Sequence, residues 1–366
     1  MIINICRTKS MLSHYRNLLL LVCSVVLLTS CWHDQPNDEN GPNDDTNFNP
    51  NNITLKEVGI SDLMELMDEK LIFTDSNGEI WIAPKGTYTD GASVPRLGLS
   101  VTDGRYKFEF LKAAVVHDAY CQEENESRTP EQYQSRPWQA VHKMFHEACL
   151  AGGTSESLAG TMFALVWLFG PRWDDPGRDL SEVSDEMLTS MFYSSKKWIE
   201  SSEPKLTEIE AWMDKREPAL IKISKLESMG LSALDRRDQT AATEVLQQAD
   251  AYITDTLQKL PNDPAILNLK GQLHKNMAIK YRQLDMKNNE INELNKANDA
   301  FQKVITIEPD NPSTLSGLGS IMILRNDLGR AEAYNHKALV IDPKNPTVMR
   351  DRAQFNQLRR VRPSPQ

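Results

Sequence analysis

The sequence predicts an α+β domain in the N-terminal half of the chain and an all-α array of helical repeats in its C-terminal part. Two β-leaning runs around an Asn-Gly turn, followed by helical patterns, indicate the α+β domain. An internal period of 34 residues indicates the repeats. The chain has 366 residues, 40% hydrophobic and 25% charged, so it is long enough for two or three globular units.

The charge balance argues against one class of partner. The chain has 41 Lys and Arg residues and 51 Asp and Glu residues, which gives a net charge of −10. Nucleic-acid backbones attract basic surfaces, so we expect no nucleic-acid partner.

Residues 1–31 are predicted to be a targeting segment. Basic residues precede an uncharged stretch, Leu18–Leu28, which is too short to span a bilayer. The tetrapeptide Leu28-Thr29-Ser30-Cys31 resembles the bacterial lipobox, which implies cleavage before Cys31 and lipidation of its thiol. Trp32, where an Asp would retain many lipoproteins in the inner membrane, favours the outer membrane, with the body facing the periplasm. The alternative is an N-terminal membrane anchor with an incidental cysteine.

Residues 32–53 are mostly Asn, Asp and Pro, and such a segment cannot bury enough apolar surface to fold. We expect a disordered tether here, followed by the α+β domain over residues 54–175. Its hairpin is expected at Leu71–Thr74 and Glu79–Ala83. Its helices are expected at Phe110–Cys121, Pro137–Leu150 (with Ser135 as a cap) and Leu158–Phe169.

Three motifs occur in order within this domain. They are Ala83–Arg96 (APKGTYTDGASVPR), Ala113–Asp118 (AAVVHD) and Phe163–Gly170 (FALVWLFG). Together they resemble the family called domain of unknown function 1353, over residues 70–173. The resemblance implies a loop after a strand, a His-Asp pair on a helix and a final apolar helix, without implying a reaction. His142 stands where the family usually has an Asp.

The histidines of this domain suggest a metal site. His142 and His146 are four residues apart on one helix face, and His117 adjoins Asp118. We expect these four residues to bind a divalent transition metal such as zinc or manganese. With Asp90, His117 and Asp118 as catalytic residues, the site would be that of a metal-dependent hydrolase.

Each part of this site also has a structural alternative. Asp118 can pair with an arginine, namely Arg96, Arg105 or Arg128. Asp90 can simply hold its turn by bonding backbone amides. His142 and His146 border an apolar stripe and can be buried without a ligand. Cys121 and Cys149 are expected to form a disulfide in an oxidising compartment, or to be metal ligands, and one pair cannot do both.

The C-terminal repeats follow two bridging helices. We expect the bridging helices within residues 176–217, one from a capping box at Asp179–Glu182 to Glu200 and the next from Pro204. The hexapeptide Ile307–Pro312 (IEPDNP) recurs as Ile341–Pro346 (IDPKNP). Its offset of 34 residues resembles that of tetratricopeptide repeats, which implies a solenoid of about three repeats over residues 218–360.

The inner face of this solenoid is expected to capture a protein or peptide partner. In the first well-preserved repeat the residues predicted to face the groove are Asn268, Gln272, Lys275 and Asn276. The alternative is a solvated face in an array without a ligand.

Two functions follow from these patterns. The first is an envelope lipoprotein that acts as a protein-interaction scaffold through its repeats. The second is a periplasmic metal-dependent hydrolase of cell-wall peptides, whose repeats recruit the substrate or a regulator.

Overall fold

The computed structural model of the chain describes residues 47–58, 64–89, 110–121, 135–343, 348–350 and 352–353. The chain divides into two units, Met1–Asp45 and Thr46–Gln366, and every described residue belongs to the second unit. The predicted lipidation site Cys31, residues 32–46 of the predicted tether, and Asp90 lie outside the described residues. The prediction of a disordered tether is wrong for the end of that segment, because Phe48 is buried and pairs with Phe73 in a sheet of the N-terminal domain.

Two small antiparallel sheets form the β part of the N-terminal domain. In the first, Leu71 pairs with Ala83 and Thr74 with Ile80, which confirms the predicted hairpin. Gly78 closes its turn at φ +80°, a left-handed conformation that glycine adopts without steric cost. The first sheet has the order β1 (Phe48–Asn49), β4 (Lys70–Thr74), β5 (Ile80–Pro84), and the second has β2 (Leu55–Glu57), β3 (Met64–Leu66), β6 (Tyr88–Thr89).

Three helices complete this domain: α2 (Leu111–Cys121), α4 (Trp138–Ala151) and α5 (Glu156–Phe169). They confirm the three predicted helices to within two residues, although Pro137 occupies the N-cap of α4 and no side chain caps that helix. Helix α2 packs against α4 and against strands of both sheets, and the hydroxyl of Tyr120 accepts a hydrogen bond from the Ile82 amide at 3.0 Å. None of the helices within the described residues has the length and apolarity needed to cross a membrane.

The first bridging helix begins later than predicted. Helix α6 (Asp185–Ser202) is capped by Ser184, whose hydroxyl accepts a hydrogen bond from the Met187 amide. The predicted capping box fails because the Asp179 carboxylate accepts from the amide and hydroxyl of Ser181, a local turn that competes with helix formation. The second bridging helix, α7 (Leu206–Asp235), continues without a break into the repeat region, so residue 217 lies inside a helix.

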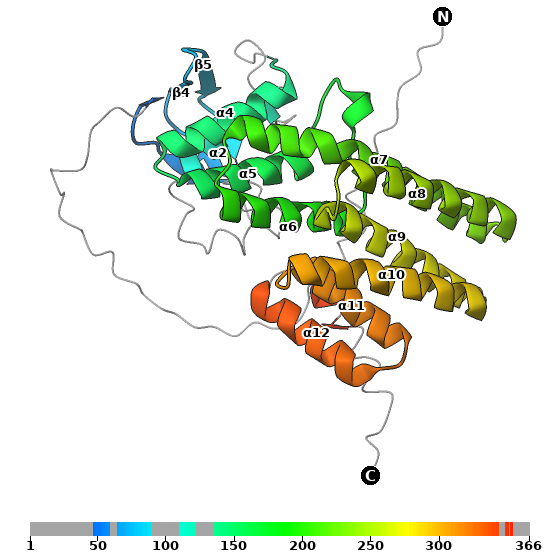
Figure 1. Ribbon diagram of the computed structural model, residues 1–366. Coiled ribbons are helices and arrows are strands. Elements are labelled where there is room, and N and C mark those ends of the chain that lie inside the picture. The colour runs from blue at the N-terminus through cyan, green and yellow to red at the C-terminus, as the bar shows by residue number, and fades with distance from the viewer. Residues whose placement is uncertain are drawn as a thin grey trace, which may run out of the picture. The chain divides into compact units, whose positions relative to one another are not determined.

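The remaining helices form consecutive hairpins, which confirms the predicted all-α array (Figure 1). Each hairpin turn has a left-handed residue directly before the second helix's N-cap: Arg237, Asp285 and Asn326, at φ 60°, 58° and 64°. A repeated sequence unit produces the same left-handed backbone conformation at each turn. The hairpins are α7 with α8 (Gln239–Lys259), α9 (Pro264–Gln283) with α10 (Lys287–Ile307), and α11 (Pro312–Leu324) with α12 (Leu328–Ile341).

Glycine allows the closest helix contacts in the array. Phe301 of α10 is fully buried between Gly271 of α9 and Gly317 of α11. A Cβ atom at Gly271 would lie 2.3 Å from the Phe301 ring, and one at Gly317 would lie 2.7 Å from it. The ring therefore joins two hairpins at positions where only glycine fits.

We predict that Gly271→Ala lowers the free energy of unfolding by about 1–3 kcal/mol, because the added methyl group overlaps a buried ring that has no room to move. Gly329→Ala is the matched control: a Cβ there meets nothing within 4 Å, and alanine favours the helix, so stability should stay equal or rise slightly. Chemical denaturation of both variants measures the difference, and equal effects would contradict this packing argument.

A buried charge network joins three helices of the array. His274 of α9 is completely buried, with Nε2 3.0 Å from the Asp250 carboxylate and Nδ1 2.5 Å from that of Glu293. The ammonium group of Lys296 lies 3.2 Å from both carboxylates. Burial alone would lower the pKa of His274, but the two carboxylates outweigh it and raise this pKa above its ordinary value.

We predict a stability loss at high pH from this network. Because the folded-state pKa of His274 is raised, its contribution is complete below about pH 6.5 and is lost as the pH rises through the raised value, by at most about 1.4 kcal/mol per pH unit. Denaturation at several pH values should show this slope in the parent chain and in the exposed-histidine control His336→Gln, and not in His274→Gln. A slope that persists in His274→Gln would contradict the assignment.

Candidate metal centre

Three side chains from α2 and α4 converge inside the N-terminal domain. Nε2 of His117 lies 3.0 Å from Nδ1 of His142 and 3.5 Å from Sγ of Cys121. One potential ligand atom from each residue lies within 4.8 Å of the other two. The i, i+4 spacing on α2 places His117 and Cys121 on one helix face, and the packing of α2 on α4 brings His142 opposite them.

The separations of these atoms suit a tetrahedral metal ion. Bond lengths of about 2.0–2.1 Å to nitrogen and about 2.3 Å to sulfur place two nitrogens about 3.3 Å apart, and nitrogen and sulfur about 3.6 Å apart. The observed 3.0 and 3.5 Å need only small side-chain movements to reach these values. Because all three donor atoms lie within 4.8 Å of one another, side-chain adjustment would let them supply three of the four ligands of one zinc-sized ion.

Asp118 supports His117 from behind the cluster. Its Oδ1 lies 3.6 Å from Nδ1 of His117, the ring nitrogen that faces away from Cys121, and its Oδ2 accepts a 2.7 Å hydrogen bond from the hydroxyl of Thr89. A carboxylate beside the second nitrogen of a ligating histidine fixes the orientation of the ring. Asp118, predicted as a metal ligand, thus lies beside a ligand and outside the converging group.

The environment of His142 keeps its imidazole neutral. The side chain is fully buried, and this burial lowers the pKa of His142 well below its ordinary value, with further lowering by His117 and Arg172 and a small opposing effect of the Pro171 backbone. A neutral imidazole is the form that binds metals. Gly170 passes close to the ring, since a Cβ there would lie 3.0 Å from Cε1 of His142.

Cys121 and Cys149 are both free thiols in the structure, without the disulfide expected as one alternative. Burial raises the pKa of both thiols, and the Asp118 carboxylate raises that of Cys121 further. Metal binding would therefore displace a proton from Cys121. Cys149 lies in the hydrophobic core and outside the converging group.

His146 lies one turn beyond His142 on α4 without joining the site. It is buried with its ring nearly perpendicular to that of Phe163, at 6.1 Å between centroids, and burial lowers its pKa to about 4. The shared helix face predicted a shared ligand role, but Phe163 of α5 and His117 of α2 contact different turns of α4. The fourth sequence candidate, Asp90, lies outside the described residues.

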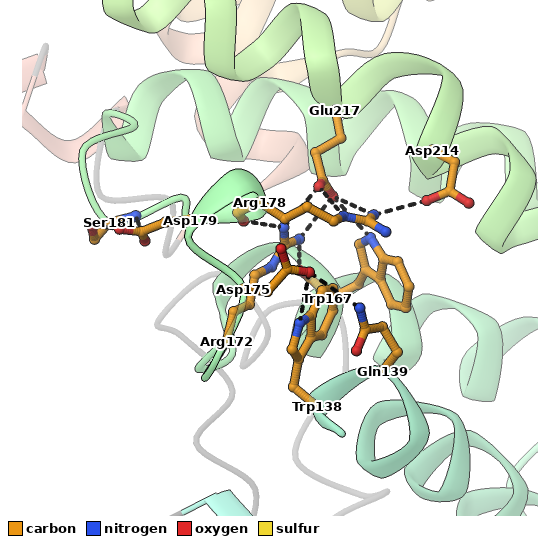
Figure 2. A network of polar contacts seen from close by, with 10 residues as sticks. All are labelled: Trp138, Gln139, Trp167, Arg172, Asp175, Arg178, Asp179, Ser181, Asp214 and Glu217. Atoms are coloured by element: carbon orange, nitrogen blue, oxygen red, sulfur yellow. Dashed lines mark hydrogen bonds and ion pairs between the residues drawn. The ribbon is translucent and has the colours of Figure 1, made fainter. Parts of the chain in front are cut away.

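A network of buried charges and tryptophans lies next to the cluster, which it reaches through Trp138 and His142. The carboxylate of Glu217 on α7 accepts hydrogen bonds from Arg172, Arg178 and the indole of Trp167 (Figure 2). The Arg172 guanidinium lies 4.6 Å from the ring centroid of Trp138, whose own ring lies 5.5 Å from that of His142. This network connects α7 to the helix that bears His142.

Sequence reasoning did not assign Thr89 or Arg172 to the site. Thr89 reaches the cluster through Asp118 and Arg172 reaches it through Trp138, and one sequence does not reveal such tertiary contacts. Cys121 did have a detectable signal, its four-residue spacing from His117, although a disulfide explained it equally well.

Comparisons with known proteins place a family match within the N-terminal domain. Residues 64–166 match the family model described as protein of unknown function (DUF1353). Two uncharacterized proteins from Sinorhizobium fredii, y4iH and y4jT, are 35% and 36% identical to this chain over 101 residues, which is 28% of this chain. The aligned segment spans 38% and 27% of these relatives' own lengths. No solved structure matches the chain.

Proposed function

We propose that the N-terminal domain binds one divalent transition metal through His117, Cys121 and His142, and that it acts as a metal-dependent hydrolase. The observation that carries this proposal is the convergence of three donor atoms from two helices.

The donor set indicates the ion and its chemistry. Two imidazoles and a thiolate favour zinc, whereas manganese prefers oxygen ligands. Bound with three protein ligands, such an ion supplies an acidified water for attack on an amide or ester. Asp118 would orient His117, and Asp90, the residue after Thr89 in the sequence, is the candidate acid–base group.

The setting of this domain is part of the proposal. The pattern of residues 1–31 supports an envelope lipoprotein anchored through Cys31, tethered by the Asn- and Asp-rich residues that precede β1 and facing the periplasm from the outer membrane. The 34-residue offset and the uniform hairpin turns support tetratricopeptide repeats that act as a scaffold for a protein partner or the substrate. On location, cell-wall peptides are the nearest substrate class.

We predict that the chain purified without chelator carries about one zinc ion, and that His142→Gln and Cys121→Ser each reduce this content at least tenfold. Each substitution removes a ligand and retains a side chain of related size. Elemental analysis of the purified protein, with circular dichroism to verify helical content, measures the effect.

The control is His146→Gln, which changes another buried histidine on the same helix, outside the converging group. It should retain the metal. Loss of metal from His146→Gln but not from His142→Gln would show that His146, and not His142, is the ligand. A parent chain purified without metal would refute the proposal.

A further inference from the structure

Helix α6 covers the face of the array that was expected to be open. It packs against α9 and α11 of the array, and also against α5 and α7. Asn268, Gln272 and Lys275 of α9 are therefore buried within the chain. The fourth predicted groove residue, Asn276, donates a 2.8 Å hydrogen bond to Glu227 of α7. The prediction of an open groove at these positions is corrected: the chain fills it with its own helices.

The N-terminal turn of α6 is held by charge. The ammonium group of Lys275 lies 2.7 Å from the Glu186 carboxylate, and the two side chains are 3% and 12% exposed. Arg350 also pairs with Glu186. Since Glu186 lies in the first turn of α6, its negative charge also interacts favourably with the positive end of the helix dipole and stabilises the helix.

The next contacts use equivalent positions of two repeats. Two turns beyond Glu186, the hydroxyl of Ser194 donates a 3.0 Å hydrogen bond to Glu308, and the hydroxyl of Tyr193 donates to Asp342. Glu308 and Asp342 are 34 residues apart, at the same position of the recurring hexapeptide, and both are buried. Successive repeats thus present a buried carboxylate to neighbouring hydroxyls of α6, as equivalent positions along the concave surface of a repeat array do when they bind one ligand.

Within the described part of the chain, several buried polar atoms at this contact, on the three helices that meet here, are left without a hydrogen bond. Such atoms make the closed state less favourable than full burial would suggest, because water could bond them if the helices separated. The atoms are Ser190 Oγ on α6, Asn268 Nδ2 and Gln272 Oε1 on α9, and Ser313 Oγ on α11.

We propose that α6 is an internal ligand of the helical array. The array's inner face recognises a helix that has an acidic residue in its first turn and a Tyr-Ser pair two turns later, and α6 occupies this site in cis. Its release would expose the groove without unfolding the array. This inference concerns a different surface from the metal site and stands independently of it.

The test uses the full chain and a fluorescent peptide of residues 183–203, which contains α6 with its cap. In Glu186→Lys, the new charge faces Lys275 and Arg350, so α6 should dissociate. We expect its amides to exchange with deuterium at least tenfold faster while α9 and α10 keep their protection. The peptide should bind Glu186→Lys at least tenfold more tightly than it binds the parent chain.

Two controls make the result specific. Asp185→Lys changes an exposed acidic residue in the same turn by the same charge, and should behave like the parent chain. Adding Lys275→Glu to Glu186→Lys restores an opposite-charge pair and should reduce peptide binding toward the parent level.

Two outcomes would overturn the proposal. One is loss of protection in α6, α9 and α10 together, which would make α6 an integral part of the array's core. The other is opening of α6 with peptide binding no tighter than in Asp185→Lys. If Glu186→Lys is insoluble, deuterium exchange of the backbone amides is measured in the parent chain instead. Amides of α6 that exchange at least tenfold faster than those of α9 would support the proposal, and equal exchange rates would refute it.

Discussion

The packing of α2 against α4 is the contact on which the candidate site depends. Neither helix holds the three donors alone, because His117 and Cys121 lie on α2 and His142 on α4. The sheets support this arrangement from the other side of α2, where Tyr120 bonds to β5 and Asp118 bonds to Thr89 of β6. A shift of either helix would separate donors that now lie close enough for one ion.

The second constraint is the burial of Glu217 and its two arginines. A buried carboxylate without a partner is costly, so Glu217 requires Arg172 and Arg178 to remain in place. Arg172 in turn lies over Trp138 beside His142. The N-terminal domain is therefore joined to α7 by contacts close to the candidate metal centre. Through α6 it is joined to the array a second time.

Local sequence signals predicted the local structure well. The Asn-Gly turn, the three helices of the N-terminal domain and the hairpins of the array all follow from short-range patterns. Tertiary outcomes were less predictable. The start of α6 depended on whether Asp179 bonded to a helix or to Ser181, and periodicity gave no sign that α6 would cover Asn268 and Lys275. Equal spacing on α4 could not separate His142 from His146, because only the packing of α2 distinguishes them.

Anomalous X-ray diffraction at the zinc edge, from crystals of the chain grown with zinc, tests the central claim most directly. The account predicts one strong peak within bonding distance of His117 Nε2, Cys121 Sγ and His142 Nδ1. Full zinc occupancy at another place, with these three side chains hydrogen-bonded to one another, would contradict it.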